Sequence, residues 1–174
     1  MGRENIMLQV DVKKKYVTEF IQAWNQFLTT NNKYLNEENL LEEDFFCSDG
    51  IDPAMVSYEA DEIANLFDWP NETGLLDFCK DLLKKYPDIE VVIDYDLSWD
   101  NCGDCCVESY HIHDHQIDYD IMAGECLCGE DLYEEMKDDF AEQQEEDPDF
   151  EPVLIDDVYY NVDSRNVGTW RVEQ

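Results

Sequence analysis

The stretch IEVVIDYDLSWD, residues 89–100, alternates apolar and polar side chains with a period of two. The apolar members are Ile89, Val91, Ile93, Tyr95, Leu97 and Trp99, and the polar members that face the other way are Glu90, Asp94, Asp96 and Asp100. Such alternation predicts a β-strand with one buried face and one wet face. Because these polar members are carboxylates, we expect the wet face of the sheet to carry a line of negative charge.

Two more strands are predicted directly after this one. CVESYHIH (106–113) and QIDYDIM (116–122) have strand character, and NCGDC (101–105) and HDHQ (113–116) are predicted turns. The third strand places Asp118 and Asp120 outward. This order predicts an antiparallel meander at the centre of the fold.

The rest of the chain supplies helices to cover that meander. Amphipathic helices are predicted over YVTEFIQAWNQFL (16–28) and over 74–85 with Thr73 as its cap, and a short helix begins from Asn36. Residues 6–12 and 55–60 are predicted strands, and VLIDDVYYNV (153–162) is a last strand with GTWRV trailing after it. We therefore expect one α+β domain spanning 1–174: a central antiparallel sheet, helices packed on one face, and a C-terminal acidic helix plus strand.

The charge of the chain is extreme and uneven. Forty-four Asp and Glu residues against eleven Lys and Arg give a formal net charge of −33. Residues 86–164 form an acidic sub-region in which Lys137 is the sole Lys or Arg, and they include a helix predicted over 130–146. Its narrow apolar stripe is Leu132, Tyr133, Met136 and Phe140. Hydrophobic residues still make up 44% and aromatic residues 13%, which is typical of a folded chain rather than of acidic disorder.

Several function classes fit this composition poorly. Repulsion from phosphates opposes direct binding of nucleic acid, and no phosphate-binding, nucleophile or metalloprotease motif indicates an enzyme. We therefore expect no catalytic residue and no cofactor. No apolar run is long enough for a membrane span and no apolar leader is visible, while seven cysteines without such a leader indicate reduced thiols. The expected location is the cytoplasm.

Cysteines and histidines offer a competing hypothesis, a zinc-binding regulatory module. Cys102, Cys105, Cys126 and Cys128 form two pairs of thiol ligands about 20 residues apart. In a separate interpretation, His111, His113 and His115, which stand at alternate positions, could chelate a catalytic metal from one strand face. We favour the simpler interpretation, small thiols near a turn and solvent-exposed histidines, and expect no bound metal.

The acidity instead favours a basic protein partner. Two rows of carboxylates are candidate partner-binding residues, since alternate residues of a strand, roughly 6.6 Å apart, have spacings like those of consecutive phosphates. The strand row is Glu90, Asp94, Asp96, Asp100, Asp118 and Asp120, and the helix row is Glu130, Asp131, Glu134, Glu135, Asp138, Asp139, Glu142, Glu145 and Glu146. A basic channel that holds nucleic acid could accept these carboxylates in place of phosphates.

On the acidic strand VVIDYDLSWD and the acidic segment EDLYEEMKDDFAEQQEED, the chain resembles the small acidic anti-defence inhibitors of phages and mobile elements. The resemblance lies in size, charge and these two segments, not in a specific motif. It implies an anti-CRISPR protein that occupies the basic surface of an effector nuclease, or alternatively an anti-restriction DNA mimic. Many such inhibitors are dimers, and Tyr159 and Tyr160 are candidate exposed aromatics for a homodimer. Residues 54–122 also resemble ferredoxin-like domains.

Overall fold

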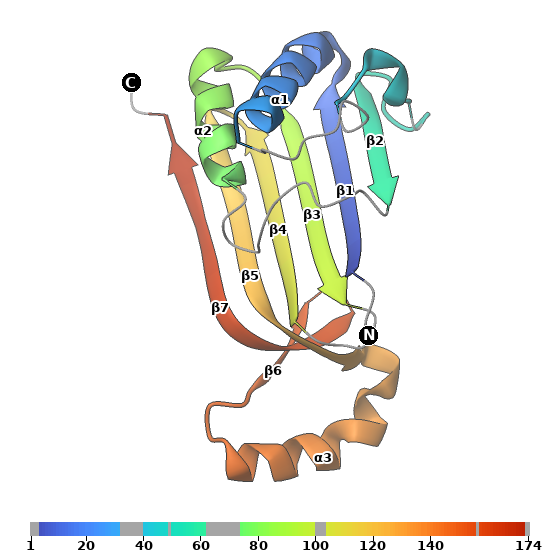
Figure 1. Cartoon of the computed structure of the whole chain (residues 1–174), viewed down its shortest axis with the longest axis vertical. Helices are drawn as coiled ribbons and strands as arrows, with labels where there is room; N and C mark the ends of the chain where they lie inside the picture. The colour runs from blue at the N-terminus through green and yellow to red at the C-terminus, as the bar shows by residue number, and fades with distance from the viewer. Residues whose placement is uncertain are drawn as a thin grey trace.

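The computed structural model describes residues 4–31, 40–48, 50–61, 74–99, 104–155 and 157–172. Its antiparallel strands form one seven-stranded sheet in the order β2-β1-β3-β4-β5-β7-β6 (Figure 1). The strands are β1 (Glu4–Lys13), β2 (Met55–Asp61), β3 (Val91–Trp99), β4 (Asp104–His113), β5 (Gln116–Gly129), β6 (Pro152–Ile155) and β7 (Val158–Arg171). The helices are α1 (Val17–Asn31), α2 (Leu75–Lys85) and α3 (Tyr133–Glu146), with 3-10 turns at Lys14–Tyr16, Glu43–Phe45 and Glu130–Leu132. The predicted α+β class is confirmed.

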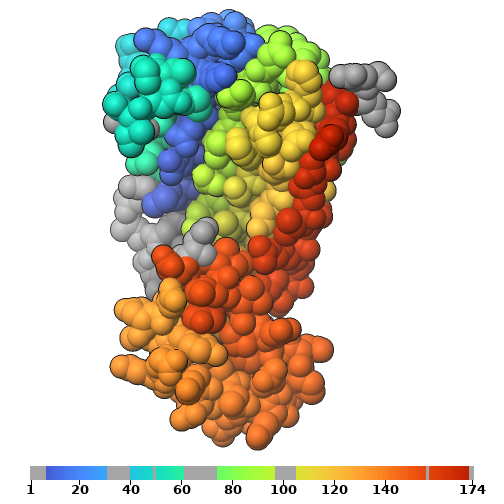
Figure 2. Space-filling model, turned by 180° about the vertical axis from the view of Figure 1, so that it is seen from behind, coloured from blue at the N-terminus to red at the C-terminus, as the bar shows by residue number. Residues whose placement is uncertain are grey.

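Helices α1 and α2 cover one face of the sheet, and among the described residues no helix lies over the opposite face (Figures 1 and 2). Alternate residues of each strand point into the covered side, as in Val10 of β1 and Ile93 of β3, both fully buried. The alternation predicted for residues 89–96 is confirmed. We call the uncovered side the open face; it carries the side chains of Gln9, Asp11, Val92, Asp94, Asp96, Ser109, His111, His113, Asp118, Asp120 and Thr169.

An aromatic cluster joins the two covering helices. Phe20 and Trp24 of α1 are buried and both contact Phe78 of α2, with ring centroids 6.0 and 5.4 Å from that of Phe78. These residues belong to the apolar faces that the helical periodicity predicts. Burying an aromatic side chain of this size stabilises the fold by about 1.5–3 kcal/mol. The main core is therefore formed by the sheet, α1 and α2.

Strands β4 and β5 form a hairpin with a two-residue loop. Asp114 and His115, the loop residues, both have positive φ, 48° and 64°. Positive φ at both central residues is the backbone of a type I′ turn, whose twist matches that of paired strands. The turn predicted at HDHQ is therefore confirmed. The turn predicted at 101–105 is wrong at its end, because Asp104 and Cys105 are already paired with β5 as part of β4.

The far end of the β5–β7 ribbon bends away from the main sheet and carries α3 (Figure 1). The pairing register shifts between Ala123 and Gly124 and again between Cys126 and Cys128. Such bulges bend and twist a strand. At Gly124 a Cβ would lie 2.4 Å from the carbonyl oxygen of Asn161, so the close approach of the two strands requires glycine there.

A second, smaller core holds α3 on this ribbon. Phe140 of α3 packs with Phe150 and Cys128, and Met136 and the stacked rings of Tyr133 and Tyr159 complete the cluster. The predicted stripe of α3 is confirmed in three of its four members. Leu132 is 45% exposed, since it lies in the preceding 3-10 turn rather than on the buried side of the helix.

The C-terminal region contains two strands where the sequence predicts one. Residues 152–155 and 158–171 form β6 and β7, which pair as a hairpin, so GTWRV belongs to β7. The chain reverses at Asp157, whose φ of 69° lies in the left-handed region. Aspartate tolerates that region, but the stretch IDDV lacks the glycine that usually signals a hairpin turn.

Two further predictions concern topology and segments. Strands β2 and β3 are parallel with β1 between them and α2 linking them, which makes one split β-α-β unit. Residues 104–122 continue as a meander of two strands. The ferredoxin-like resemblance of residues 54–122 is therefore limited to this β-α-β unit. The predicted short helix at Asn36, the Thr73 cap, Asp100 and Cys102 lie outside the described residues.

Candidate acidic interface and histidine pair

The described members of the predicted strand row lie along the open face. Asp94 and Asp96 belong to β3, and Asp118 and Asp120 belong to β5, two strands away. Asp94 is exposed, whereas Asp96 is half-buried, and this burial raises the pKa of its carboxyl group. Glu90 directly precedes β3. The row is therefore a patch that crosses the sheet rather than a single line.

Most of these carboxylates already have partners within the protein. Asp120 receives two hydrogen bonds from the guanidinium of Arg165, at 3.1 and 2.8 Å. Glu90 forms an ion pair with Lys13 at 3.1 Å. Asp94 accepts a hydrogen bond of 2.9 Å from Ser109. Part of the negative charge of the open face is thus compensated before any partner arrives.

The helix row has a different environment. All nine of its carboxylate side chains are exposed: Glu130, Asp131, Glu134, Glu135, Asp138, Asp139, Glu142, Glu145 and Glu146. Within the described residues, the ion pair made by this row is that of Glu134 with Lys137, at 3.2 Å. The helix stands beyond the end of the sheet, apart from α1 and α2 (Figure 2). Of the two rows, it is the less compensated.

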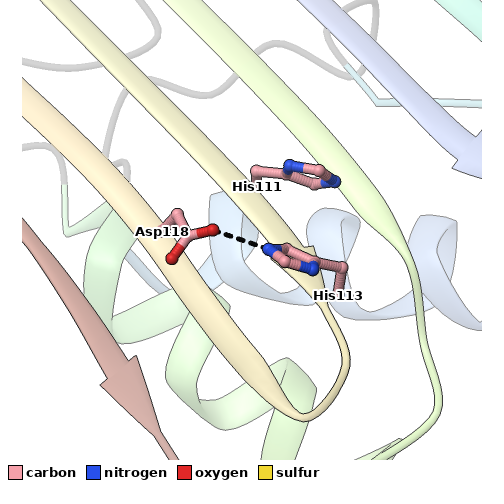
Figure 3. A group of neighbouring side chains, drawn as sticks. All are labelled: His111, His113 and Asp118. Atoms are coloured by element: carbon pink, nitrogen blue, oxygen red, sulfur yellow. Dashed lines mark hydrogen bonds and ion pairs between the residues drawn. The ribbon is translucent and has the colours of Figure 1, made fainter.

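A histidine pair and an aspartate meet at the other end of the open face (Figure 3). His111 and His113 project from the same face of β4 with ring centroids 4.2 Å apart. Asp118 of β5 lies opposite His111 in the strand register, and its Oδ2 is 2.6 Å from Nε2 of His113. The potential ligand atoms of these three residues all lie within 4.8 Å of one another.

Neighbouring side chains fix His113 and Asp118 in place. Asp114 lies 3.1 Å from Nδ1 of His113, and the hydroxyl of Thr169 donates a 2.7 Å hydrogen bond to Oδ1 of Asp118. The hydrogen bond to Asp118, and then the one to Asp114, raise the pKa of His113. The hydrogen bonds from His113 and Thr169 lower the pKa of Asp118. The two side chains therefore form a charge-assisted pair.

The third histidine leaves the group. His115 lies in the hairpin turn, and its Nε2 is 3.0 Å from Oδ1 of Asp88. Because the turn residues have left-handed backbones, the alternation of the strand stops before His115. The alternative in which three histidines chelate a metal from one strand face is therefore wrong for His115. Asp118, which the sequence did not indicate as a neighbour of His111 and His113, lies beside them instead.

Among the described residues, Cys105, Cys126 and Cys128 do not form a group of three metal-binding side chains. Cys105 and Cys128 are buried and Cys126 is half-buried. Among the described residues, the group of three metal-binding side chains that meets is the one at His111, and it contains no cysteine. The zinc-module hypothesis therefore gains no support from Cys105, Cys126 and Cys128, while Cys102 lies outside the described residues.

The aromatic pair proposed for a homodimer is largely used within the chain. Tyr159 stacks on Tyr133 with ring centroids 4.2 Å apart, and both rings belong to the small core under α3. Tyr160 is half-buried. The expectation of two exposed tyrosines is therefore wrong.

The covered face hides a carboxylate that the sequence did not single out. Glu108 of β4 is 2% exposed, the one buried charged side chain of the described residues. The hydroxyl of Tyr110 donates to its Oε1, and the thiol of Cys106 lies 3.8 Å from Oε2. Burial, and then the nearby charge of Glu108, raise the pKa of Tyr110 and of the Cys79 thiol. Since Glu108 is fully enclosed by the core, we assign it to the fold rather than to a site.

Comparison with known proteins adds no relative. No protein-family model, no curated protein and no solved structure matches this chain. None of the described helices is long and apolar enough to cross a membrane.

Proposed function

We propose that the protein inhibits a nucleic-acid-binding defence nuclease by presenting carboxylates to the basic surface on which that nuclease holds its nucleic acid. The favoured target is a CRISPR effector, whose channels for guide and target are large and basic. A restriction enzyme is the alternative target. In this proposal the protein acts by binding in the cytoplasm of the bacterial host and performs no catalysis.

The observation that carries the proposal is the row of exposed carboxylates on α3 and on the 3-10 turn before it. Nine exposed carboxylates lie between Glu130 and Glu146, with Lys137 as the cation among them. At a rise of about 1.5 Å per residue this segment is about 25 Å long. It therefore carries one negative charge per about 3 Å, close to the roughly 3.4 Å per charge of a single DNA strand. A surface that binds phosphates along a strand would meet a similar charge density here.

Charge compensation favours the helix row over the strand row as the docking surface. On the open face, Asp120 and Glu90 are paired with Arg165 and Lys13. A partner's arginine would have to displace those cations, which lowers the net gain from each contact. On α3 the carboxylates other than Glu134 have no such competitor among the described residues.

The high net charge also supports this proposal. A charge of −33 opposes compaction through self-repulsion, yet it accelerates association with a basic partner. The small core beneath α3 fixes the direction in which the helix points, so that the charges need not be ordered during binding. Preorganisation of this kind reduces the entropic cost of association.

The experiment is a competition assay with candidate nucleases. The protein is added to a guide-loaded CRISPR effector and, in parallel, to a restriction enzyme, and DNA binding and cleavage are measured at about 50 mM and about 500 mM salt. For the true target we expect loss of DNA binding and cleavage at about 50 mM salt, relative to the nuclease alone at the same salt. We expect the complex of the protein with the nuclease, followed by pull-down, to dissociate at about 500 mM salt. Binding to a nuclease whose guide loading, DNA binding and cleavage all stay unchanged would refute the proposal.

Matched variants test which row docks. We expect Glu135→Lys with Asp138→Lys to lose inhibition, because both side chains lie on the exposed acidic helix. Asp94→Lys on the open face is the control and should retain it. If the two proteins are equally inhibitory while both remain folded, the acidity is a solvated coat and not a docking surface.

A further inference from the structure

The end of the open face next to the β4–β5 turn has a different chemistry from α3. His111, His113 and Asp118 bring two imidazoles and one carboxylate together, with ligand atoms within 4.8 Å (Figure 3). Along β5, Asp118 is about 35 Å from the strand end that leads to α3. The properties of this group can therefore be tested separately from the proposed docking surface.

The strand geometry by itself directs these side chains to one point. Residues 111 and 113 are two apart on β4, so both project from the same side of the sheet. Asp118 is the direct cross-strand neighbour of His111, and directly opposed residues have Cβ atoms about 4.5–5.5 Å apart. The two-residue turn at Asp114 and His115 fixes this register. No rearrangement of the backbone is needed to bring the three groups together.

Hydrogen bonds from neighbouring residues orient Nε2 of His113 and Oδ2 of Asp118 toward each other. Asp114 holds Nδ1 of His113, which turns Nε2 toward Asp118. Thr169 donates to Oδ1 of Asp118 at 2.7 Å, and the amide nitrogen of Gln116 lies 3.2 Å from Oδ1 and 3.4 Å from both Oδ2 and Nε2 of His113. Oδ2 of Asp118 faces the histidine, and a bound ion would take the place of the weak Gln116 contacts. A carboxylate on the far nitrogen of a histidine is the usual partner of a metal-binding imidazole, because it orients the ring and increases its basicity.

His111 has no such engagement. None of the hydrogen bonds between described residues involves it, and its side chain is exposed. Its ring nevertheless lies against that of His113, with an angle of 31° between the ring planes. An imidazole without a hydrogen-bond partner, beside an anchored histidine–aspartate pair, is a third donor with a lone pair to offer.

We propose that His111, His113 and Asp118 form a surface binding site for a divalent first-row transition-metal ion. Two imidazoles and one carboxylate are the donor set of three-ligand sites that keep open coordination positions for water or another ligand. Ligand atoms about 2.1 Å from a tetrahedral ion are about 3.4 Å apart. The 2.6 Å contact between His113 and Asp118 has to open by less than 1 Å, and His111 closes the third side by rotating its side chain.

The donor set also defines which ions the site takes. Imidazole nitrogens suit Zn²⁺, Co²⁺ and Ni²⁺, whereas Mg²⁺ and Ca²⁺ prefer all-oxygen ligands. The negative field of the protein attracts any dication, so selectivity has to come from the histidines. With three protein ligands and an exposed position, the ion exchanges with solution rather than being locked in as in a four-ligand structural site.

The test is a titration of the chelator-treated full-length protein with Zn²⁺ in competition with a chromophoric chelator, followed by Co²⁺ absorption spectroscopy. We expect one high-affinity ion per chain, no competition from excess Mg²⁺, and a Co²⁺ spectrum without thiolate charge-transfer bands. His111→Ala and His113→Ala should each weaken Zn²⁺ binding by more than about 10-fold, and Asp114→Asn by about 10-fold. His115→Ala is the matched control and should bind as the unaltered protein does.

Circular dichroism shows whether each variant is folded. We expect the His111→Ala variant to fold, because His111 is exposed. Equal losses of Zn²⁺ binding in His115→Ala and His111→Ala would mean diffuse attraction by the acidic surface and would overturn the proposal. So would Zn²⁺ binding that survives in a His111→Ala, His113→Ala double variant. A Co²⁺ spectrum with thiolate bands that Cys126→Ser abolishes would place the ion at the cysteines and would also overturn it.

Discussion

Like-charge repulsion along α3 offers a direct test of whether its carboxylates serve the fold. Glu135 and Asp138 are exposed and lie one turn from other acids on both sides. Three i,i+4 pairs within the helix involve them: Glu134–Asp138, Glu135–Asp139 and Asp138–Glu142. The perturbation is the double substitution Glu135→Lys with Asp138→Lys, which converts all three pairs from like to opposite charge.

The expected magnitude follows from the pair energies of helix surfaces. A like-charge i,i+4 pair destabilises a helix by about 0.2–0.5 kcal/mol, and an opposite-charge pair stabilises it by a similar amount. Each conversion is therefore worth about 0.4–1 kcal/mol, and three of them about 1–3 kcal/mol. We expect the double variant to be more stable than the unaltered protein by this amount at low salt.

Urea denaturation at two salt concentrations measures the effect. Near 1 M salt the Debye length falls to about 3 Å, so most of the gain should disappear. The control Glu135→Gln with Asp138→Asn removes the repulsion without adding attraction and should give about half of the gain. If the Lys variant is less stable than the unaltered protein at low salt, these carboxylates contribute to the fold and the reasoning is wrong.

Three substitutions test the packing. Phe150→Ala should lower the free energy of unfolding by about 3–5 kcal/mol, because Phe150 is 1% exposed at the centre of the small core. Hydrogen exchange in α3 should become faster, and unchanged exchange would argue against anchoring of α3 by this core. Gly124→Ala should destabilise by about 1–3 kcal/mol in urea denaturation, since its new Cβ meets the Asn161 carbonyl oxygen, and a neutral result would mean that β5 and β7 separate freely. Tyr110→Phe removes a donor from buried Glu108 and should cost about 1–3 kcal/mol in a thermal melt, whereas an unchanged melting temperature would show that the hydroxyl is dispensable.

The sequence predicted most of the elements because they have regular periods. Strand β3 was visible from strict alternation, and α1 and α2 from apolar residues at helical spacing. The β6–β7 hairpin was not visible, because its turn at Asp157 adopts a left-handed backbone without a glycine or Asn-Gly signal. Sequence periodicity reports the faces of an element but carries little information on a turn built from aspartates.

The site was predictable only in its parts. The pattern predicted exposed carboxylates in both rows, and this holds for the helix row and for Asp94, whereas Glu90, Asp96, Asp118 and Asp120 are half-buried. Their partners were not predictable, because Arg165 and Asp120 meet through the pairing of strands 45 residues apart in the sequence. The same reason hid the approach of Asp118 to the two histidines, which depends on the register of the β4–β5 hairpin. The burial of Glu108 was not predictable, because the residues next to it on its side of β4 are apolar and a lone glutamate among them gives no signal of its own.

The division of the apolar interior into two parts makes α3 an exchangeable cassette. The helix is seated by Tyr133, Met136 and Phe140 against the β5–β7 ribbon, and the main core under α1 and α2 does not share those side chains. A different helix is expected to pack in the same way if it keeps aromatic side chains at positions 133 and 140 and a flexible apolar side chain at position 136. The exposed residues of α3 can then be substituted so that the helix binds a different partner, while the main core under α1 and α2 stays unchanged.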